Sequence, residues 1–352
     1  MSNYTLEKAT YYYFDLLNDK EKDLYKCFLY ALRRMKATVD IKEGFSLEQV
    51  KKISRYVIND RPDIFWYRGK CAITTCNNVV VQIEFHYVYT EAQKENMVRQ
   101  IENSSLYKRI NTMIQMEKST FEKALKLYEL IIQNTEYEMG AINSGGPYYE
   151  YAYGLEGVIL KNKAVCAGYS KAFQYFANKH SILCTIVTGQ TQRSLHAWNL
   201  INLYGNYYYI DSTWGDPTFS NMANKDPNYI SYDYFCITTE ELKLSHRPVF
   251  DDPMPICTAT KYNYYEFFGL KETNYSVENV ASHIINAVKN AKNEAIIKYS
   301  SRVAYQTAVV RLFQQSEIFE ALRIASRYVN RLQTREAKYS LNEDSKIISI
   351  KL

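Results

Sequence analysis

The sequence predicts an α+β protein in which amphipathic helices alternate with short antiparallel strands. Several segments carry apolar residues three and four positions apart, which is the spacing of a helix with one buried face. Runs rich in Val, Ile and Tyr are joined at the turn dipeptides Asn77-Asn78 and Gly205-Asn206, a pattern typical of β-hairpins. Of the 352 residues, 47% are hydrophobic and 23% are charged, so a folded globular chain is expected rather than disorder.

Residues 1–112 are predicted to form a helical region that contains one β-hairpin. Ser46 is expected to cap a helix, with Glu48 in its first turn. The expected elements are helices over Glu21–Met35, from Ser46 and over Glu91–Ile101, and paired strands over Cys71–Thr75 and Val79–Tyr89.

Residues 113–255 are predicted to form a central α+β domain. Its expected elements are helices over Ser119–Gln133 and Ala164–Lys179, a glycine-rich loop over Gly140–Pro147, and strands over Cys184–Thr188, Ala197–Leu203 and Tyr207–Ser212. The proline-rich stretch from Arg247 to Pro255 is interpreted as a linker to the next domain.

Residues 256–352 are predicted to form a small α+β unit. Its expected elements are helices over Ser276–Asn293, Val303–Phe313 and Ile318–Val329, a strand over Glu294–Tyr299, and a hairpin of Ala337–Leu341 with Ser345–Lys351.

Charge and cysteine content argue against several classes of function. The formal net charge is +5 with no dense Lys/Arg stripe, so a nucleic-acid partner is not indicated. The N-terminal residues have no apolar core of a signal peptide, and no apolar run is long enough to cross a membrane. The seven cysteines include no CxxC pair, which favours reduced thiols in a cytoplasmic protein over a disulfide framework or zinc ribbon.

The 34 tyrosines admit two interpretations. They could line a surface for a polymer substrate. They could also reflect a composition that is rich in Tyr, Lys, Asn and Ile together. This second interpretation is favoured because aromatic rings commonly fill protein cores.

Cys166 is the leading candidate for a catalytic residue. It precedes an apolar stripe of Tyr169, Ala172, Phe173 and Phe176, so it falls in the first turn of a helix. The free N–H groups and positive dipole at a helix start favour a thiolate, the nucleophilic form, and can also stabilise an oxyanion. The small residues Ala167 and Gly168 leave room for a substrate carbonyl. A lone cysteine is more often a buried structural residue, so this position needs support from other groups.

His196 and Asp211 supply that support from two paired strands. With a two-residue turn at Gly205-Asn206, Asp211 faces Leu200, four residues from His196. An even separation places both side chains on one face of the hairpin, offset by about 13 Å at ~3.3 Å per residue. A wider loop, a bulge or strong twist would have to close this gap. In that arrangement Asp211 orients the imidazole, and His196 takes the proton from Cys166.

Three blocks of sequence resemble the transglutaminase-like core of bacterial proteins, within the superfamily of papain-like cysteine proteases and transglutaminases. The blocks are Lys163-Ala-Val-Cys-Ala-Gly-Tyr-Ser-Lys-Ala-Phe, His196-Ala-Trp-Asn and Tyr208-Tyr-Ile-Asp-Ser-Thr-Trp-Gly-Asp-Pro217. The resemblance implies a papain-like fold, in which the nucleophile heads a helix that packs on an antiparallel sheet. It also implies thiol acyl transfer with Cys166 as nucleophile, His196 as base and Asp211 as the third member.

The resemblance further implies an oxyanion hole made by the cysteine N–H and an upstream side chain, often Gln or an aromatic. Tyr148, Tyr149 and Tyr151 are the candidates for that second donor. Trp198 and Trp214 flank the triad residues and are interpreted as rings that shield the His–Asp pair or fill the core. The other histidines, His86, His180, His246 and His283, lack the spacing of a metal site, so no metal or cofactor is expected.

The leading functional hypothesis is therefore cysteine-dependent hydrolysis or acyl transfer on a protein or peptide amide. Proteolysis or deamidation is favoured over crosslinking because no calcium-loop pattern is present. Two other classes stay open: a silent peptide- or glycan-binding module on the same fold, and a scaffold that acts through its C-terminal unit.

Overall fold

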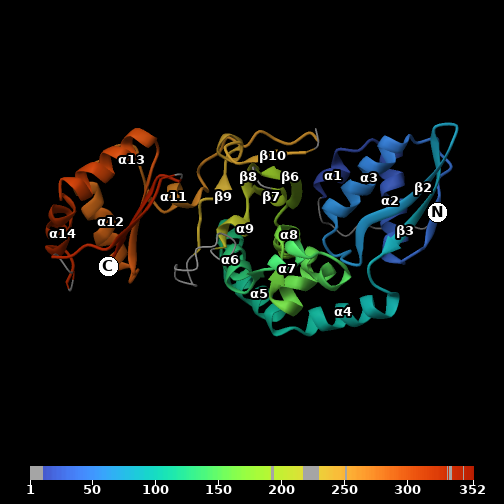
Figure 1. Ribbon diagram of the computed structural model, residues 1–352, viewed down its shortest axis with the longest axis horizontal. Coiled ribbons are helices and arrows are strands. Elements are labelled where there is room, and N and C mark those ends of the chain that lie inside the picture. Colours follow the sequence, from blue (N-terminus) through green and yellow to red (C-terminus); the bar gives the residue numbers. More distant parts are fainter. Residues whose placement is uncertain are drawn as a thin grey trace. The chain divides into compact units, whose positions relative to one another are not determined.

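The computed structural model describes residues 11–191, 194–216, 230–249, 252–330, 332, 335–343 and 345–352. The chain divides into two compact units, Met1–Thr260 and Lys261–Leu352. The division expected near residue 112 falls inside the first unit. Each unit combines helices with mainly antiparallel sheets, so the predicted α+β class is confirmed (Figure 1).

The N-terminal part of the first unit packs helices against a three-stranded antiparallel sheet of order β1-β3-β2. Its elements are α1 (Tyr12–Asp15), α2 (Asp19–Arg33), β1 (Thr38–Asp40), α3 (Leu47–Asp60), β2 (Tyr67–Cys76), β3 (Val79–Tyr87), α4 (Glu91–Asn103) and α5 (Ser105–Met116). Ser46 caps α3 in a reciprocal capping box with Gln49, as the sequence predicted. Asn77 and Asn78 both have positive φ, which is the backbone of a tight hairpin turn.

The remainder of the first unit is built on a five-stranded antiparallel sheet of order β10-β6-β7-β8-β9. Its strands are β6 (Cys184–Thr191), β7 (Leu195–Leu203), β8 (Asn206–Ile210), β9 (Phe235–Ile237) and β10 (His246–Pro248). The other elements are α6 (Thr120–Gln133), β4 (Glu136–Tyr137), α7 (Met139–Asn143), η1 (Pro147–Tyr153), η2 (Gly157–Lys161), β5 (Lys163–Ala164), α8 (Cys166–Lys179), α9 (Ser212–Gly215) and α10 (Thr239–Leu242).

The central helix α8 lies against β6 and β7 of this sheet. Its predicted apolar stripe of Tyr169, Ala172, Phe173 and Phe176 is fully buried. Two side-chain hydrogen bonds fix its position: Ser170 Oγ donates to the Ala197 carbonyl at 3.0 Å, and Asn199 Nδ2 donates to the Ser170 carbonyl at 3.0 Å. The papain-like arrangement of a helix packed on an antiparallel sheet is thereby confirmed.

The stretch expected to be a linker is instead part of the fold. His246, Arg247 and Pro248 form β10 and pair with β6 at the edge of the sheet. Further along, Asp252 accepts hydrogen bonds from Arg55 at 2.6 Å and Tyr56 at 2.8 Å, both on α3. Proline is accommodated because an edge strand leaves one row of backbone groups unpaired.

Helices also occupy segments where none was expected. The glycine-rich loop contains α7, and α5 follows directly after α4. The sharp junction between α4 and α5 occurs at Ser104, which ends the first helix and caps the second.

The second unit packs its helices on a four-stranded sheet of order β11-β12-β14-β13, in which only the β11–β12 pair is parallel. Its elements are α11 (Tyr264–Phe267), β11 (Lys271–Glu272), α12 (Val277–Lys289), β12 (Glu294–Tyr299), α13 (Arg302–Val309), η3 (Val310–Gln314), α14 (Ile318–Ser326), β13 (Tyr339–Asn342) and β14 (Ile347–Lys351). A separate apolar core, which includes Ile284, Ile297, Leu322 and Ile348, lies between helices and sheet. The predicted small C-terminal α+β unit is present.

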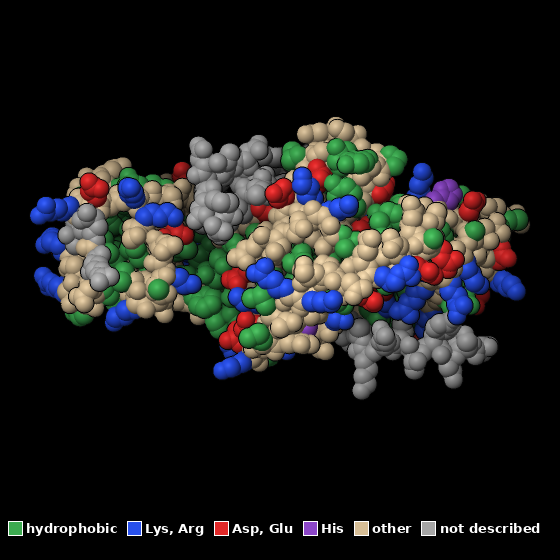
Figure 2. Space-filling view, turned by 90° about the horizontal axis from the view of Figure 1, so that it is seen from below, with side chains coloured by type: hydrophobic (Ala, Val, Ile, Leu, Met, Phe, Trp, Pro, Cys, Tyr) green, Lys and Arg blue, Asp and Glu red, His purple; other side chains and the backbone are tan. Residues whose placement is uncertain are grey.

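Acidic and basic side chains are interspersed on the face of the molecule that Figure 2 shows, without a continuous basic stripe. Within the described ranges, no helix combines the length and the apolar character that crossing a membrane requires.

Candidate active site

Cys166 is the first residue of α8 and so lies in its first turn, as the sequence predicted, although the helix begins two residues later than the expected Ala164. Val165 precedes the helix and provides no side-chain cap, and the Cys166 N–H is instead directed to the Tyr137 hydroxyl. The thiol is partly exposed and forms no disulfide. Gly168, which we expected to leave space for substrate, has a different role, because a Cβ there would lie 2.5 Å from the Ala152 carbonyl oxygen. The small residue allows η1 to pack closely on the helix start.

His196 and Asp211 are directly bonded and buried. The His196 Nε2 atom lies 2.7 Å from Asp211 Oδ2. The Cys166 thiol lies close enough to His196 to raise the pKa of its imidazole. Because Nε2 is engaged by the carboxylate, Nδ1 is the ring nitrogen left for the thiol. The structure therefore brings the three predicted side chains together in the order thiol, imidazole, carboxylate.

The hairpin that joins His196 to Asp211 has a different register from the predicted one. Leu203 pairs with Asn206, so the turn is Tyr204-Gly205 and not Gly205-Asn206. Both turn residues have positive φ, and Asn202 Oδ1 accepts the Gly205 N–H at 2.9 Å. The Tyr204 hydroxyl is also bonded by the Thr120 N–H at 2.9 Å, which anchors this uncommon conformation of a tyrosine.

This register shortens the predicted gap between the two residues. Continued by one pair beyond Asn199–Ile210, it places Trp198 opposite Asp211, so His196 is offset by two residues instead of four. The offset becomes ~7 Å at ~3.3 Å per residue, which two facing side chains can span. A shift of two keeps both residues on one face. The predicted strand end at Ser212 was wrong, because β8 ends at Ile210 and Asp211 caps α9.

The Asp211 carboxylate is held by four hydrogen-bond donors. Oδ1 accepts the backbone N–H groups of Thr213 at 2.9 Å and Trp214 at 3.1 Å. Oδ2 accepts from His196 and, at 3.0 Å, from Nε2 of His246. Burial disfavours the charged carboxylate, but His196 and His246 outweigh burial and hold the pKa of Asp211 well below its usual range. The site therefore contains a stable buried anion.

That anion changes the titration of His196. Burial acts to lower the pKa of the imidazole, but the Asp211 carboxylate and, next, Cys166 outweigh it and raise the pKa to about 10. At neutral pH the ring is therefore an imidazolium beside the thiol.

His246 is the site residue that sequence reasoning missed. It was set aside because it lacks metal-ligand spacing, yet β10 brings it to the carboxylate of Asp211. Its side chain, His196 and Asp211 place ligand atoms within 4.8 Å of one another, which is a geometry that could hold a metal ion. Only the pairing of β10 with β6 reveals this.

Tyr137 is a second residue that the sequence did not single out. It lies on β4, which pairs with β5 just before Cys166. Burial, most strongly, and the charge of Cys166 raise the pKa of its hydroxyl, while a hydrogen bond from the Cys166 backbone acts to lower it. The phenol therefore lies next to the nucleophile and its N–H.

Of the tyrosines proposed from the sequence, Tyr149 and Tyr151 pack on the same small cluster as Val165 and Ala167, beside Cys166. The Tyr151 hydroxyl donates to Glu138 Oε2 at 2.7 Å. The Tyr149 ring packs against Gly140, where an added Cβ would lie 2.7 Å from its hydroxyl oxygen. Tyr148 is largely exposed. Tyr137 and Cys166 are far apart in the sequence, and only the β4–β5 pairing brings them together.

The two tryptophans enclose the imidazole as expected. Trp198 is fully buried and stacks on His196 with centroids 6.2 Å apart, and Trp214 lies 6.0 Å from the same ring. The third motif block ends at Pro217, which lies outside the described residues.

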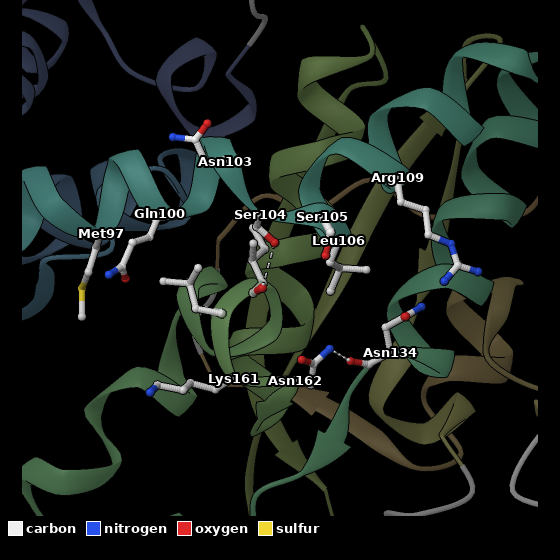
Figure 3. A pocket seen from close by; sticks show the side chains of 12 residues that line it. Met97, Gln100, Asn103, Ser104, Ser105, Leu106, Arg109, Asn134, Lys161 and Asn162 are labelled. Atoms are coloured by element: carbon white, nitrogen blue, oxygen red, sulfur yellow. Dashed lines mark hydrogen bonds between the residues drawn. The ribbon is translucent and has the colours of Figure 1, made fainter.

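An open cavity of about 920 Å³ lies apart from these groups, between α4, α5 and η2. Figure 3 shows that polar and apolar side chains share its lining, with Lys161 and Arg109 on different sides, and Asn162 Nδ2 donates to the Asn134 carbonyl at 2.8 Å. None of the triad residues lines it.

Comparison with known proteins gives relatives of one general kind. No protein-family model matches the chain. Over 134 residues it is 25% identical to the kyphoscoliosis peptidase of Mus musculus and 24% identical to that of Homo sapiens, which covers 35% of this chain and 20% of each relative. The chain thus spans about a fifth of the length of these curated relatives.

Some solved structures show a partial likeness to the chain. A protein described as a TGase covers 54% of this chain and 52% of its own, at 14% identity and a TM-score of 0.29. A candidate cysteine protease from Cytophaga hutchinsonii covers 41% of this chain and 61% of its own, at 14% identity and a TM-score of 0.24. At these TM-scores the fold assignment rests on the chain's own helices and sheets. Over part of its length, the chain is similar to a peptidase and to proteins described as a TGase and a candidate cysteine protease.

Proposed function

We propose that the chain is a cysteine-dependent enzyme that cleaves or transfers the acyl group of a protein or peptide amide. The observation that carries this proposal is the buried 2.7 Å hydrogen bond between His196 and Asp211, with Cys166 at the start of α8 and close enough to raise the pKa of His196. A binding module without turnover would not require a buried carboxylate that keeps an imidazolium beside a partly exposed thiol.

In the proposed reaction, the Cys166 thiolate attacks the substrate carbonyl carbon and forms a tetrahedral oxyanion. The His196 imidazolium then donates its proton to the leaving amine as the C–N bond breaks, which leaves a thioester on Cys166. Neutral His196 next removes a proton from the second substrate. Water gives hydrolysis or deamidation, and an amine gives transamidation.

We infer that the Cys166 N–H and the Tyr137 hydroxyl stabilise the oxyanion. Without substrate, the Cys166 N–H is directed to the Tyr137 hydroxyl. A substrate carbonyl oxygen that accepts a hydrogen bond from this N–H would therefore lie beside the Tyr137 O–H. Rotation of the hydroxyl lets it donate to the same oxygen. The loss of one such donor typically lowers turnover by about 10²-fold.

The thiolate is tested by alkylating the protein with limiting iodoacetamide at about pH 6, followed by peptide mapping. An ordinary thiol is only ~0.3% ionised at that pH, so we expect Cys166 to react roughly 10²-fold faster than an unactivated cysteine. Cys27 and Cys76 are matched controls, because both are more exposed than Cys166 and should react faster if access alone decides. A Cys166 rate equal to or below theirs would contradict the proposal.

The reaction type is tested by incubating the protein with casein and a fluorescent primary amine, and by mass spectrometry of the products. Cleaved peptides, Gln converted to Glu, and amine-labelled Gln identify proteolysis, deamidation and transamidation in turn. The Cys166→Ala variant is the control, since it should abolish whichever product appears.

A further inference from the structure

A second histidine is built into the site from the opposite side of Asp211. His246 lies on the edge strand β10 and has no exposed surface. Its Nε2 atom is 3.0 Å from Asp211 Oδ2, the oxygen that also binds His196. The two imidazoles therefore share one carboxylate oxygen.

Nδ1 of His246 is hydrogen-bonded to Ser245, and this contact indicates which nitrogen of the ring carries the hydrogen. The Tyr234 hydroxyl donates to Ser245 Oγ at 3.1 Å, and Ser245 Oγ lies 2.7 Å from His246 Nδ1. A serine hydroxyl that accepts a hydrogen bond from Tyr234 can donate its own hydrogen to Nδ1. Nδ1 is then an acceptor, and Nε2–H is free to donate to Asp211.

Aromatic rings surround this second histidine. The ring centroid of His246 is 4.9 Å from that of Trp198, 4.7 Å from Trp214 and 5.4 Å from Tyr234. Low polarity strengthens a hydrogen bond and makes an unpaired polar group costly, so the bond to Asp211 holds the carboxylate firmly.

The same three groups could be interpreted as a metal site, because His196, Asp211 and His246 offer ligand atoms within 4.8 Å of one another. The hydrogen bonds account for the cluster without an ion. Both Nε2 atoms point to one carboxylate oxygen, and the other oxygen is bound by the N–H groups of Thr213 and Trp214. Each donor has an acceptor, as a closed proton-donor network requires.

We propose that His246 is a positioning residue of the acyl-transfer site, whose Nε2–H holds Asp211 Oδ2 against His196. The inference rests on the proposed function and deepens it. If this hydrogen bond is lost, the carboxylate can turn away from His196, and the imidazolium loses electrostatic support. The proton of His196 should then be lost at lower pH than in the wild type.

The test measures the iodoacetamide rate of Cys166 from about pH 5 to about pH 11, where the upper inflection reports loss of the His196 proton. Asp211, His196 and Tyr234 face His246, with Cys166 beyond His196, so the profile of each variant is compared with the wild type. For His246→Leu we expect the upper inflection to move about one pH unit lower. His246→Gln can donate from its amide and should restore the inflection to within a few tenths of a unit.

Ser245→Ala provides a milder variant in case His246→Leu fails to fold. It removes the donor to Nδ1, so the inflection should move in the same direction by a smaller amount. His180→Leu is the matched control, because it deletes a histidine that is bonded to Asn111 at 3.0 Å and lies outside the site.

The inference is overturned if folded His246→Leu keeps the wild-type inflection, if Gln fails to restore it, or if a chelator shifts the wild-type profile. These outcomes differ from a failure of the proposed function. In that case, wild-type Cys166 itself would react no faster than Cys27 and Cys76.

Discussion

Replacing Asp211 with Asn tests whether the buried carboxylate is the source of thiol activation. The substitution keeps the size of the side chain and an oxygen for the N–H groups of Thr213 and Trp214. It removes the negative charge and can place an NH₂ group against the Nε2 atoms of His196 and His246.

The magnitude follows from the titration of His196. The pKa of His196 is about 10 instead of 6.5, and among the groups that raise it Asp211 has the largest effect. The difference corresponds to ~5 kcal/mol in favour of the imidazolium. Without Asp211, burial acts against the charged ring and Cys166 is the remaining group that raises its pKa, so we expect the ring to be mainly neutral at about pH 7. An ordinary thiol is ~3% ionised at that pH, so the alkylation rate of Cys166 should fall by roughly 30-fold.

The assay is the rate of iodoacetamide alkylation at about pH 7, with circular dichroism to verify folding. Asp252→Asn is the matched control, because it neutralises another largely buried carboxylate that binds Arg55 and Tyr56. It should lower stability but leave the Cys166 rate close to wild type. A folded Asp211→Asn variant that reacts within about threefold of wild type would refute the reasoning.

Three further predictions concern catalysis, stability and packing. Tyr137→Phe should lower turnover about 10²-fold, measured with the substrate found by casein profiling. The alkylation rate of Cys166 should stay within about threefold of wild type, because alkylation forms no oxyanion. The His196–Asp211 pair should contribute stability that is present below about pH 6.5 and is lost as the pH rises through about 10, so the wild-type advantage in melting temperature over Asp211→Asn should shrink across that range. Gly189→Ala should destabilise the protein by ~2 kcal/mol in urea denaturation, since its Cβ would lie 2.3 Å from the Arg247 carbonyl oxygen of β10.

The sequence alone determined the elements whose signals are local. Ser46 caps its helix through a hydroxyl that reaches only three residues, and the Asn77-Asn78 turn depends on two residues that tolerate positive φ. Cys166 could be placed at a helix start because the apolar stripe behind it has a helical period. His196 and Asp211 could be assigned to one face because side chains alternate along a strand.

The tertiary structure decided what depends on contacts between distant segments. The hairpin turns at Tyr204-Gly205 because Asn202 and the Thr120 N–H stabilise that turn. Thr120 lies on helix α6, far from the hairpin in the sequence. β10 was mistaken for a linker because its strand character comes from pairing with β6, not from its own residues. His246 and Tyr137 lie at the site because their strands pair with β6 and β5. Spacing along the sequence does not indicate these pairings. The residues of the site could thus be chosen from the sequence, whereas the groups that hold them in place were fixed by the packing of the sheet.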